Sequence, residues 1–153
     1  MADAPIRVLF VCTHNSARSQ IAEALLQRDG GADFEVHSAG TEVSRVNPYA
    51  IRVLEDAGID WRDARSKSVT EFLGQPFDYV ITVCDRAREA CPVFPGATNT
   101  RHWGLDDPSE VEGTDPERLA AFERTRTEVE ARLRPFVDDA LRAAGRPPRP
   151  GRA

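Results

Sequence analysis

The chain has 153 residues, of which 41% are hydrophobic and 29% charged, a balance typical of one globular domain with a core of its own. Its net charge of −5 argues against general nucleic-acid binding, so any anion site must be local. No apolar run approaches the roughly 20 residues of a membrane span, and no signal-peptide pattern precedes the first strand. We therefore expect a cytoplasmic monomer, in a compartment where cysteines are usually reduced.

Strand and helix patterns alternate along the chain. Apolar runs predict strands at residues 6–11, 34–40, 77–83 and 98–103, the first apolar throughout and buried on both faces. Periodicity and capping signals predict helices from residue 16 or 17 to about 28, from Asn47-Pro48 to near 58, and from Asp115-Pro116 to about 144. Shorter pieces are predicted at residues 59–61 (extended), 69–73 (one helical turn) and 85–90 (helical).

This alternation predicts an α/β fold of three layers, an open, mainly parallel four-stranded sheet with helices on both faces. Residues 1–144 are expected to form a single domain, and residues 145–153 a disordered tail. Because the carboxyl ends of parallel strands meet at one edge of a sheet, functional groups that follow separate strands should gather there. These groups are Cys12, Cys84 and the pair Asp106-Asp107.

The loop between the first strand and the first helix contains the clearest chemical signal. Its free N–H groups and the helix N-terminus favour an anion, and Arg18 adds a planar charged fork suited to a tetrahedral oxyanion. The same positive field favours the thiolate of Cys12, a candidate nucleophile to which Ser19 can donate a hydrogen bond. The loop residues expected to bind the oxyanion are Thr13, His14, Asn15, Ser16, Ala17 and Arg18.

The spacing of Cys12 and Arg18 is by itself a weak signal in a chain rich in arginine. Its setting, directly after an apolar strand and directly before a helix, is less common. The alternative is a buried, inert cysteine that closes a strand. His14 also has a second interpretation, in which its side chain merely points outward, and His37, on a strand, is expected to be structural.

Four side chains are candidates to support this loop. Asn15 is expected to hold the loop backbone through side-chain hydrogen bonds, and Glu23 and Ser38 to reach the loop from below. Lys67, the only lysine, is expected to approach the same cluster. For each of them the alternative is a solvated surface role.

Asp107 is the candidate general acid. An oxygen displaced from a tetrahedral oxyanion is a poor leaving group, and a partly buried carboxyl can protonate it. Asp106 is the rival, and we prefer Asp107 because Pro108 stiffens its backbone. In isolation the dipeptide has the plainer interpretation of a turn.

Cys84 and Cys91 are seven residues apart. On a helix they would share a face but lie about 10.5 Å apart along its axis. A disulfide needs Cα atoms within about 7 Å, so the pair closes only if the segment unwinds. That suits a redox relay, and the alternative is two unrelated buried thiols. We expect no metal and no cofactor, because no second close-spaced ligand pair is present and His102 stands alone.

Four segments, in order and at compatible spacings, resemble the thioredoxin-coupled arsenate reductases, which share the fold of the low-molecular-weight tyrosine phosphatases. They are CTHNSARSQ (12–20), VNP (46–48), Cys84 to Cys91-Pro92, and HWGLDDP (102–108), and the likeness covers about residues 6–142. The first motif alone indicates only a phosphatase-like protein. The cysteine pair and the last segment are far more specific.

The resemblance implies a reaction in stages. Arsenate, with phosphate or sulfate as analogues, binds in the loop, where Arg18 and the amides hold its charge. Cys12 attacks arsenic and Asp107 protonates the departing oxygen. Cys84 then attacks Cys12 and releases arsenite, and Cys91 attacks Cys84. The resulting disulfide is reduced by thioredoxin or an equivalent thiol reductant.

The sequence also departs from the family in two places. Some relatives bind potassium beneath the loop with Asn, Glu, Ser and Asp side chains. Here Asn15, Glu23 and Ser38 are in place, but Lys67 falls about where the Asp would be. Its ammonium group is expected to replace the ion, so we predict little dependence on potassium. The His14 position is often glycine in relatives.

Two other functions compete with arsenate reduction. A low-molecular-weight protein tyrosine phosphatase would hydrolyse aryl phosphates with Cys12, Arg18 and Asp107, and would not need the other two cysteines. Such enzymes usually place an aromatic residue after Asp-Pro, whereas Ser109 stands here. Weak phosphatase activity is still expected, because phosphate and arsenate share shape and charge. A non-catalytic thiol sensor would leave Asp107 idle.

Overall fold

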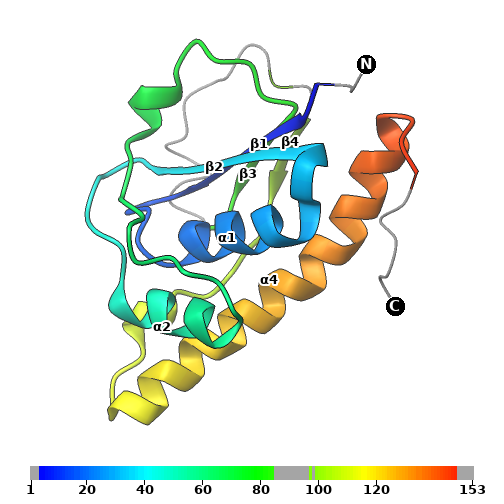
Figure 1. Cartoon of the computed structure of the whole chain (residues 1–153). Helices are drawn as coiled ribbons and strands as arrows, with labels where there is room; N and C mark the ends of the chain where they lie inside the picture. The colour runs from blue at the N-terminus through cyan, green and yellow to red at the C-terminus, as the bar shows by residue number, and fades with distance from the viewer. Residues whose placement is uncertain (1–3, 85–96, 98, 148–153) are drawn as a thin grey trace.

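The sheet has four strands in the order β2-β1-β3-β4 (Figure 1). The computed structural model describes residues 4–84, 97 and 99–147. The strands are β1 (Ile6–Cys12), β2 (Phe34–Gly40), β3 (Tyr79–Thr82) and β4 (Asn99–His102). All three pairings are parallel, so the α/β fold is confirmed with a sheet that is entirely parallel in the described residues.

Three α-helices lie together on one face of the sheet, where each contacts the other two (Figure 1). They are α1 (Arg18–Gly30), α2 (Pro48–Asp56) and α4 (Asp115–Ala143), and short 3-10 helices form at η1 (Gly31–Asp33), η2 (Val69–Phe72) and η3 (Pro108–Glu110). The opposite face carries the segment with η2, where the Phe72 ring lies 5.2 Å from that of His37. The helix expected at residues 85–90 falls outside the described residues.

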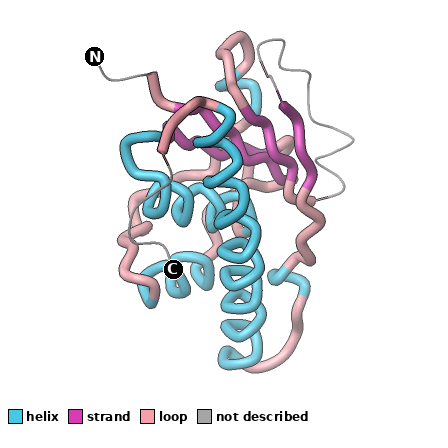
Figure 2. The backbone as a smooth tube through the Cα atoms, turned by 90° about the vertical axis from the view of Figure 1, so that its right-hand side faces the viewer, coloured by secondary structure: helices cyan, strands magenta, loops and turns pink. Residues whose placement is uncertain are grey.

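Helix α4 crosses the helical side of the molecule along its whole length (Figure 2). Its Phe136 ring packs on aromatic rings from three strand ends, at centroid distances of 6.3 Å to Phe34, 5.0 Å to Tyr79 and 5.9 Å to Trp103. This packing ties β2, β3 and the end of β4 to one helix. Nowhere in the described chain is a helix both long enough and apolar enough to cross a membrane.

The prediction that the first strand is apolar throughout is wrong at Arg7. Its guanidinium carbon lies 4.5 Å from the centre of the Phe77 ring, and its Nε donates to Glu35 at 2.7 Å. On the face of β1 opposite α4, Arg7 therefore packs on an aromatic ring and pairs with a carboxylate, so a charged side chain with an apolar stem is tolerated there.

Several element boundaries differ from the prediction because of local hydrogen bonds. Helix α4 is capped by Thr114 and not by Asp115: the Thr114 hydroxyl accepts from the Glu117 N–H at 3.3 Å, and the Glu117 carboxylate accepts in return, a capping box. No strand forms at residues 59–61, where an extended piece was predicted; a turn follows at residues 62 and 63, and the Asp60 carboxylate accepts from the Arg62 N–H at 3.2 Å.

The predicted cap of α2 is confirmed. The Asn47 side chain accepts from the Tyr49 N–H at 2.8 Å, and Pro48 lies in the first turn of the helix. In the segment expected to be a disordered tail, Arg146 donates to the Asp33 carbonyl at 3.2 Å and to the Ala4 carbonyl. Residues 148–153 fall outside the described chain.

Candidate active site

Cys12 ends β1 at the carboxyl edge of the sheet, and its side chain is buried. Its Sγ lies 2.8 Å from Ser19 Oγ and accepts a hydrogen bond from the Asn15 N–H at 3.2 Å. Helix α1 begins at Arg18, one or two residues later than predicted, because the chain between turns back around the sulfur. The structure therefore surrounds Cys12 with donors from the loop and from the first turn of the helix.

Asn15 holds the loop in a rare backbone conformation. Its φ of 50° lies in the left-handed region, where asparagine is more common than most residues. Its Nδ2 donates to Ser19 Oγ at 2.8 Å and to Ser38 Oγ at 2.9 Å. Its Oδ1 accepts from the Lys67 N–H at 2.8 Å and from Gln20 Nε2 at 2.9 Å. The buried amide is thus fully used, as expected of a residue that fixes the loop.

Gly40, at the end of β2, allows the loop to lie against the neighbouring strand. A Cβ at this position would lie 2.7 Å from the Thr13 carbonyl oxygen and 2.8 Å from the Asn15 nitrogen, both backbone atoms. The backbone contact continues beyond it, since the Glu42 N–H donates to the Thr13 carbonyl at 2.7 Å. This role was not predicted from the sequence, where the one signal is a glycine that ends a predicted strand.

Gln20 and Trp61 connect the loop to the segment after α2, a role that was not predicted for either residue. Gln20 is fully buried, and its Nε2 donates to the Arg65 carbonyl at 3.0 Å as well as to Asn15. Its Oε1 accepts from the Trp61 indole N–H at 2.8 Å. No sequence pattern marks either residue, because their pairing depends on how the segment 59–67 folds back onto α1.

The predicted supports Glu23, Ser38 and Lys67 meet directly beneath the loop. Lys67 Nζ lies 3.5 Å from Glu23 Oε1 and 3.5 Å from Ser38 Oγ, and the Ser38 hydroxyl donates to Glu23. Burial raises the pKa of Glu23, and the nearby Lys67 ammonium opposes that rise. The described residues contain no group of three or more His, Cys, Asp or Glu able to hold a metal ion.

Arg18 points across to the loop that follows β4. Its Nη1 donates to the Leu105 carbonyl at 3.0 Å, and its Nη2 lies 3.5 Å from Asp107 Oδ2. The other Asp107 oxygen, Oδ1, accepts from the Ser109 N–H at 2.9 Å and from the Ser109 hydroxyl at 2.7 Å. Asp106, the rival acid, is exposed.

Cys84 follows β3 at the same edge of the sheet and is buried. Its Sγ lies 3.2 Å from the hydroxyl of Thr13, the residue next to Cys12. The structure therefore brings the second predicted thiol against the anion loop. Cys91, the third, falls outside the described residues.

Two adjoining cavities open on these two cysteines. A cavity of about 200 Å³ is lined by Cys12 and a cavity of about 370 Å³ by Cys84. Both are also lined by His14, Arg18 and Asp107, so these side chains stand between the two thiols. His14 is half exposed, with Nδ1 3.9 Å from the Glu42 carboxylate.

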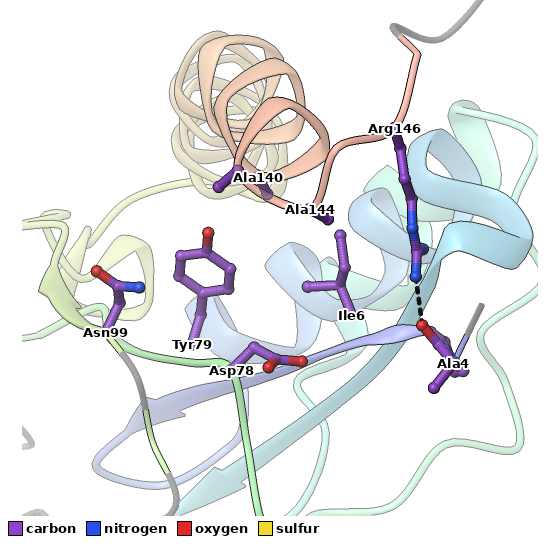
Figure 3. A pocket seen from close by; sticks show the side chains of 10 residues that line it. Ala4, Ile6, Asp78, Tyr79, Asn99, Ala140, Ala144 and Arg146 are labelled. Atoms are coloured by element: carbon purple, nitrogen blue, oxygen red, sulfur yellow. Dashed lines mark hydrogen bonds between the residues drawn. The ribbon is translucent and has the colours of Figure 1, made fainter.

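A further cavity, of about 330 Å³, lies at the opposite edge of the sheet (Figure 3). It lies between the starts of β3 and β4 and the end of α4, with the Tyr79, Asn99 and Ala140 side chains around it. Its lining includes neither cysteine nor histidine, so the nucleophiles of the described chain converge on the other edge.

Comparison with known proteins gives the family. Residues 7–146 match the family described as low molecular weight phosphotyrosine protein phosphatase. An arsenate reductase of Halalkalibacterium halodurans is 40% identical over 131 residues, which cover 86% of this chain and 94% of the relative. An arsenate reductase of Bacillus subtilis is 37% identical over the same shares of the two chains.

Solved structures of arsenate reductases have the same fold as this chain. An arsenate reductase in the phosphate-binding state matches with a TM-score of 0.74 at 32% identity, covering 86% of this chain and 96% of the other. A thioredoxin-dependent arsenate reductase of Corynebacterium glutamicum matches with a TM-score of 0.61 at 33% identity, over 87% of this chain and 64% of the other. The chain therefore belongs to the low-molecular-weight phosphotyrosine protein phosphatase family and, within it, to the thioredoxin-coupled arsenate reductases.

Proposed function

We propose that this protein reduces arsenate through a relay of three thiols, in which Cys12 attacks the substrate and Cys84 and Cys91 pass the oxidation on to thioredoxin. The observation that carries the proposal is the position of Cys84: its cavity adjoins that of Cys12, and its sulfur is 3.2 Å from the Thr13 hydroxyl. A simple hydrolase has no use for a second thiol there.

The first step is the capture of arsenate above Cys12. Arg18 now bonds to the Leu105 carbonyl and to Asp107, and an oxyanion with two negative charges offers it stronger partners. The Cys12 thiolate sulfur forms a bond to arsenic, and the hydroxyl group of the arsenate dianion leaves with its bonding pair. Asp107, on the wall of the same cavity, supplies the proton that lets this oxygen depart as water.

The second step reduces arsenic. The Cys84 thiolate attacks the Cys12 sulfur, a disulfide forms, and the electron pair of the sulfur–arsenic bond stays on arsenic, which leaves as arsenite. The Thr13 hydroxyl is placed to donate a hydrogen bond to the attacking thiolate. Cys91 then attacks Cys84 and frees Cys12, and a thioredoxin dithiol supplies two electrons and two protons to the Cys84–Cys91 disulfide.

The support for a protein reductant comes from relatives. The similar enzyme of Corynebacterium glutamicum is thioredoxin-dependent, and the relatives from Halalkalibacterium and Bacillus are arsenate reductases. A reducing cytoplasm would keep all three thiols free between turnovers, and Cys12 and Cys84 are both free in the structure.

Hydrolysis of aryl phosphates through a phosphocysteine is the competing function, because it uses Cys12, Arg18 and Asp107 alone. The side chain after Asp107-Pro108 argues against a phenolic substrate, since Ser109 has no ring to stack on it. We therefore expect phosphatase activity only as a weak side reaction.

The test is arsenate-dependent NADPH consumption in the presence of thioredoxin and thioredoxin reductase. Wild type, Cys84→Ser and Cys91→Ser are compared, and each is also assayed for hydrolysis of a small aryl phosphate. The relay predicts that both variants lose arsenate turnover while any hydrolysis remains, since Cys12 and Arg18 are intact. Normal arsenate reduction by both variants would overturn the proposal.

A further inference from the structure

We propose that Ser109 is a positioning residue that determines which carboxyl oxygen of Asp107 carries the proton given to the departing oxygen. The inference rests on the proposed role of Asp107 as the acid. It concerns a residue that the relay itself does not use, and that stands where a phosphatase of this fold usually has an aromatic side chain.

The two oxygens of Asp107 have different surroundings. Oδ1 accepts two hydrogen bonds from Ser109, from its N–H at 2.9 Å and from its hydroxyl at 2.7 Å. Oδ2 faces the Arg18 guanidinium, with Nη2 at 3.5 Å. A protonated carboxyl oxygen is a donor, and an oxygen that already accepts from two donors is a poor place for that proton. The proton therefore belongs on Oδ2.

Oδ2 is also the oxygen on the reacting side. Arg18 is the side chain that receives the oxyanion, so the atom beside it lies next to the substrate once arsenate replaces the ion pair. Asp107 and Ser109 both line the cavity over Cys12. A carboxyl turned the other way would direct its accepting oxygen at the leaving group, which needs a donor.

The backbone around Asp107 is held in place from both sides. Asp107 is the N-cap of η3, with Pro108 in the first turn, and the Pro108 side chain is buried. The remaining freedom lies in rotation of the carboxyl group about its own axis. The Ser109 hydroxyl is a second donor on one oxygen, and it opposes that rotation.

The charged and titratable groups that face Asp107 across the two cavities are Arg18, His14, Asp106, Glu110 and the Cys12 and Cys84 thiols. Among these, Arg18 is the group in ion-pair contact with it, at Oδ2. Arg18 and the substrate therefore act on the Oδ2 atom of Asp107, and Ser109 acts on its Oδ1 atom.

The experiment compares wild type with Ser109→Ala, Ser109→Thr and Asp107→Asn in single-turnover reduction of arsenate by the whole reduced enzyme. We expect Ser109→Ala to lower the rate of the chemical step about tenfold, the size of one hydrogen bond to a charged group. The arsenate concentration at half-maximal rate should change less than about twofold, because Arg18 and the loop amides remain. Ser109→Thr, which keeps the hydroxyl, should recover most of the rate.

Rescue by the conservative variant separates positioning from a merely structural role. If the Ser109 hydroxyl acts on Oδ1 of Asp107, Ser109→Thr, which keeps that donor, should retain most of the wild-type rate of the chemical step, and Ser109→Ala should not. An equal loss of rate in both variants would contradict the inference.

The variants distinguish a wrong role for Ser109 from a wrong role for Asp107. If Asp107→Asn is slow while Ser109→Ala retains the wild-type rate, Asp107 is the acid and Ser109 does not position it. If Asp107→Asn retains the wild-type rate, the acid role itself is wrong and the inference falls with it.

Discussion

Arg18 on α1 and Asp107 after β4 form an ion pair, with Nη2 3.5 Å from Oδ2, although the two residues are far apart in the sequence. The same guanidinium donates to the Leu105 carbonyl at 3.0 Å. The side chain proposed to bind the oxyanion is thus held by the loop that contains the proposed acid, and we expect the substrate to replace the contacts of Arg18 with that loop. The ion pair therefore connects the proposed oxyanion site with the proposed acid.

Replacing Arg18 by lysine should lower kcat/KM for arsenate about 100-fold, the usual effect of removing one donor to a developing oxyanion. Lysine keeps the charge but lacks the planar fork, so the loss measures geometry more than charge. The thioredoxin-coupled NADPH assay provides the measurement. Arg142→Lys, at an exposed pair with Asp139 on α4, is the matched control and should behave as wild type.

Gly40→Ala should disturb the loop around Cys12. The new Cβ would lie under 3 Å from backbone atoms of Thr13 and Asn15, which cannot move as a side-chain end can. We expect a loss of about 1–3 kcal/mol in the free energy of unfolding and a slower reaction of Cys12 with iodoacetamide. Gly104→Ala is the control for stability, because its Cβ would have only an ordinary contact of 3.7 Å with His102. Equal urea midpoints for the two variants would contradict the close approach seen at Gly40.

Potassium should not be needed for activity. The Lys67 ammonium lies 3.5 Å from Glu23 Oε1 and 3.1 Å from the Arg65 carbonyl, so a positive charge already stands beneath the loop. Arsenate turnover should be equal in potassium and sodium chloride at matched ionic strength. Lys67→Met leaves the Glu23 carboxylate without this cation and should cost about 3 kcal/mol of stability. A strong increase of wild-type activity in potassium alone would show that the ammonium does not replace the ion.

Glu23 should make the protein less stable as pH rises. Because burial raises the pKa of Glu23 above its ordinary 4.5, the folded state keeps this proton to a higher pH than the unfolded chain. The free energy of unfolding then falls as pH rises from the unfolded pKa through the folded one. Glu23→Gln removes the titration, so its stability relative to wild type should increase over that pH range in urea titrations.

Glu117 should give the opposite dependence of stability on pH. Hydrogen bonds from the Thr114 N–H and hydroxyl lower the pKa of Glu117 at the start of α4. Its contribution is therefore present above the unfolded pKa and lost as pH falls through the folded one. Glu117→Gln should lose stability relative to wild type at neutral pH, and this difference should shrink in acid. The same direction of change in both variants would contradict the assigned shifts.

Local sequence was sufficient for the strand, the anion loop and the helix that contain Cys12 and Arg18. A run of strand formers, a polar loop and a helical repeat are neighbours in the chain, so the strand–loop–helix junction can be predicted without the rest of the fold. It was also sufficient for the Asn47 cap. It failed at Arg7, whose guanidinium lies over the ring of Phe77, a residue on a distant segment.

Only the tertiary structure decided how the separate parts meet. The contact of Thr13 with Cys84 depends on β3 lying beside β1, and the close approach of Gly40 depends on β2 lying on its other side. The pairing of Trp61 with Gln20, and of Arg18 with Asp107, depends on the paths of loops. Strand order and loop path arise from packing over the whole chain, and no local pattern of residues records them.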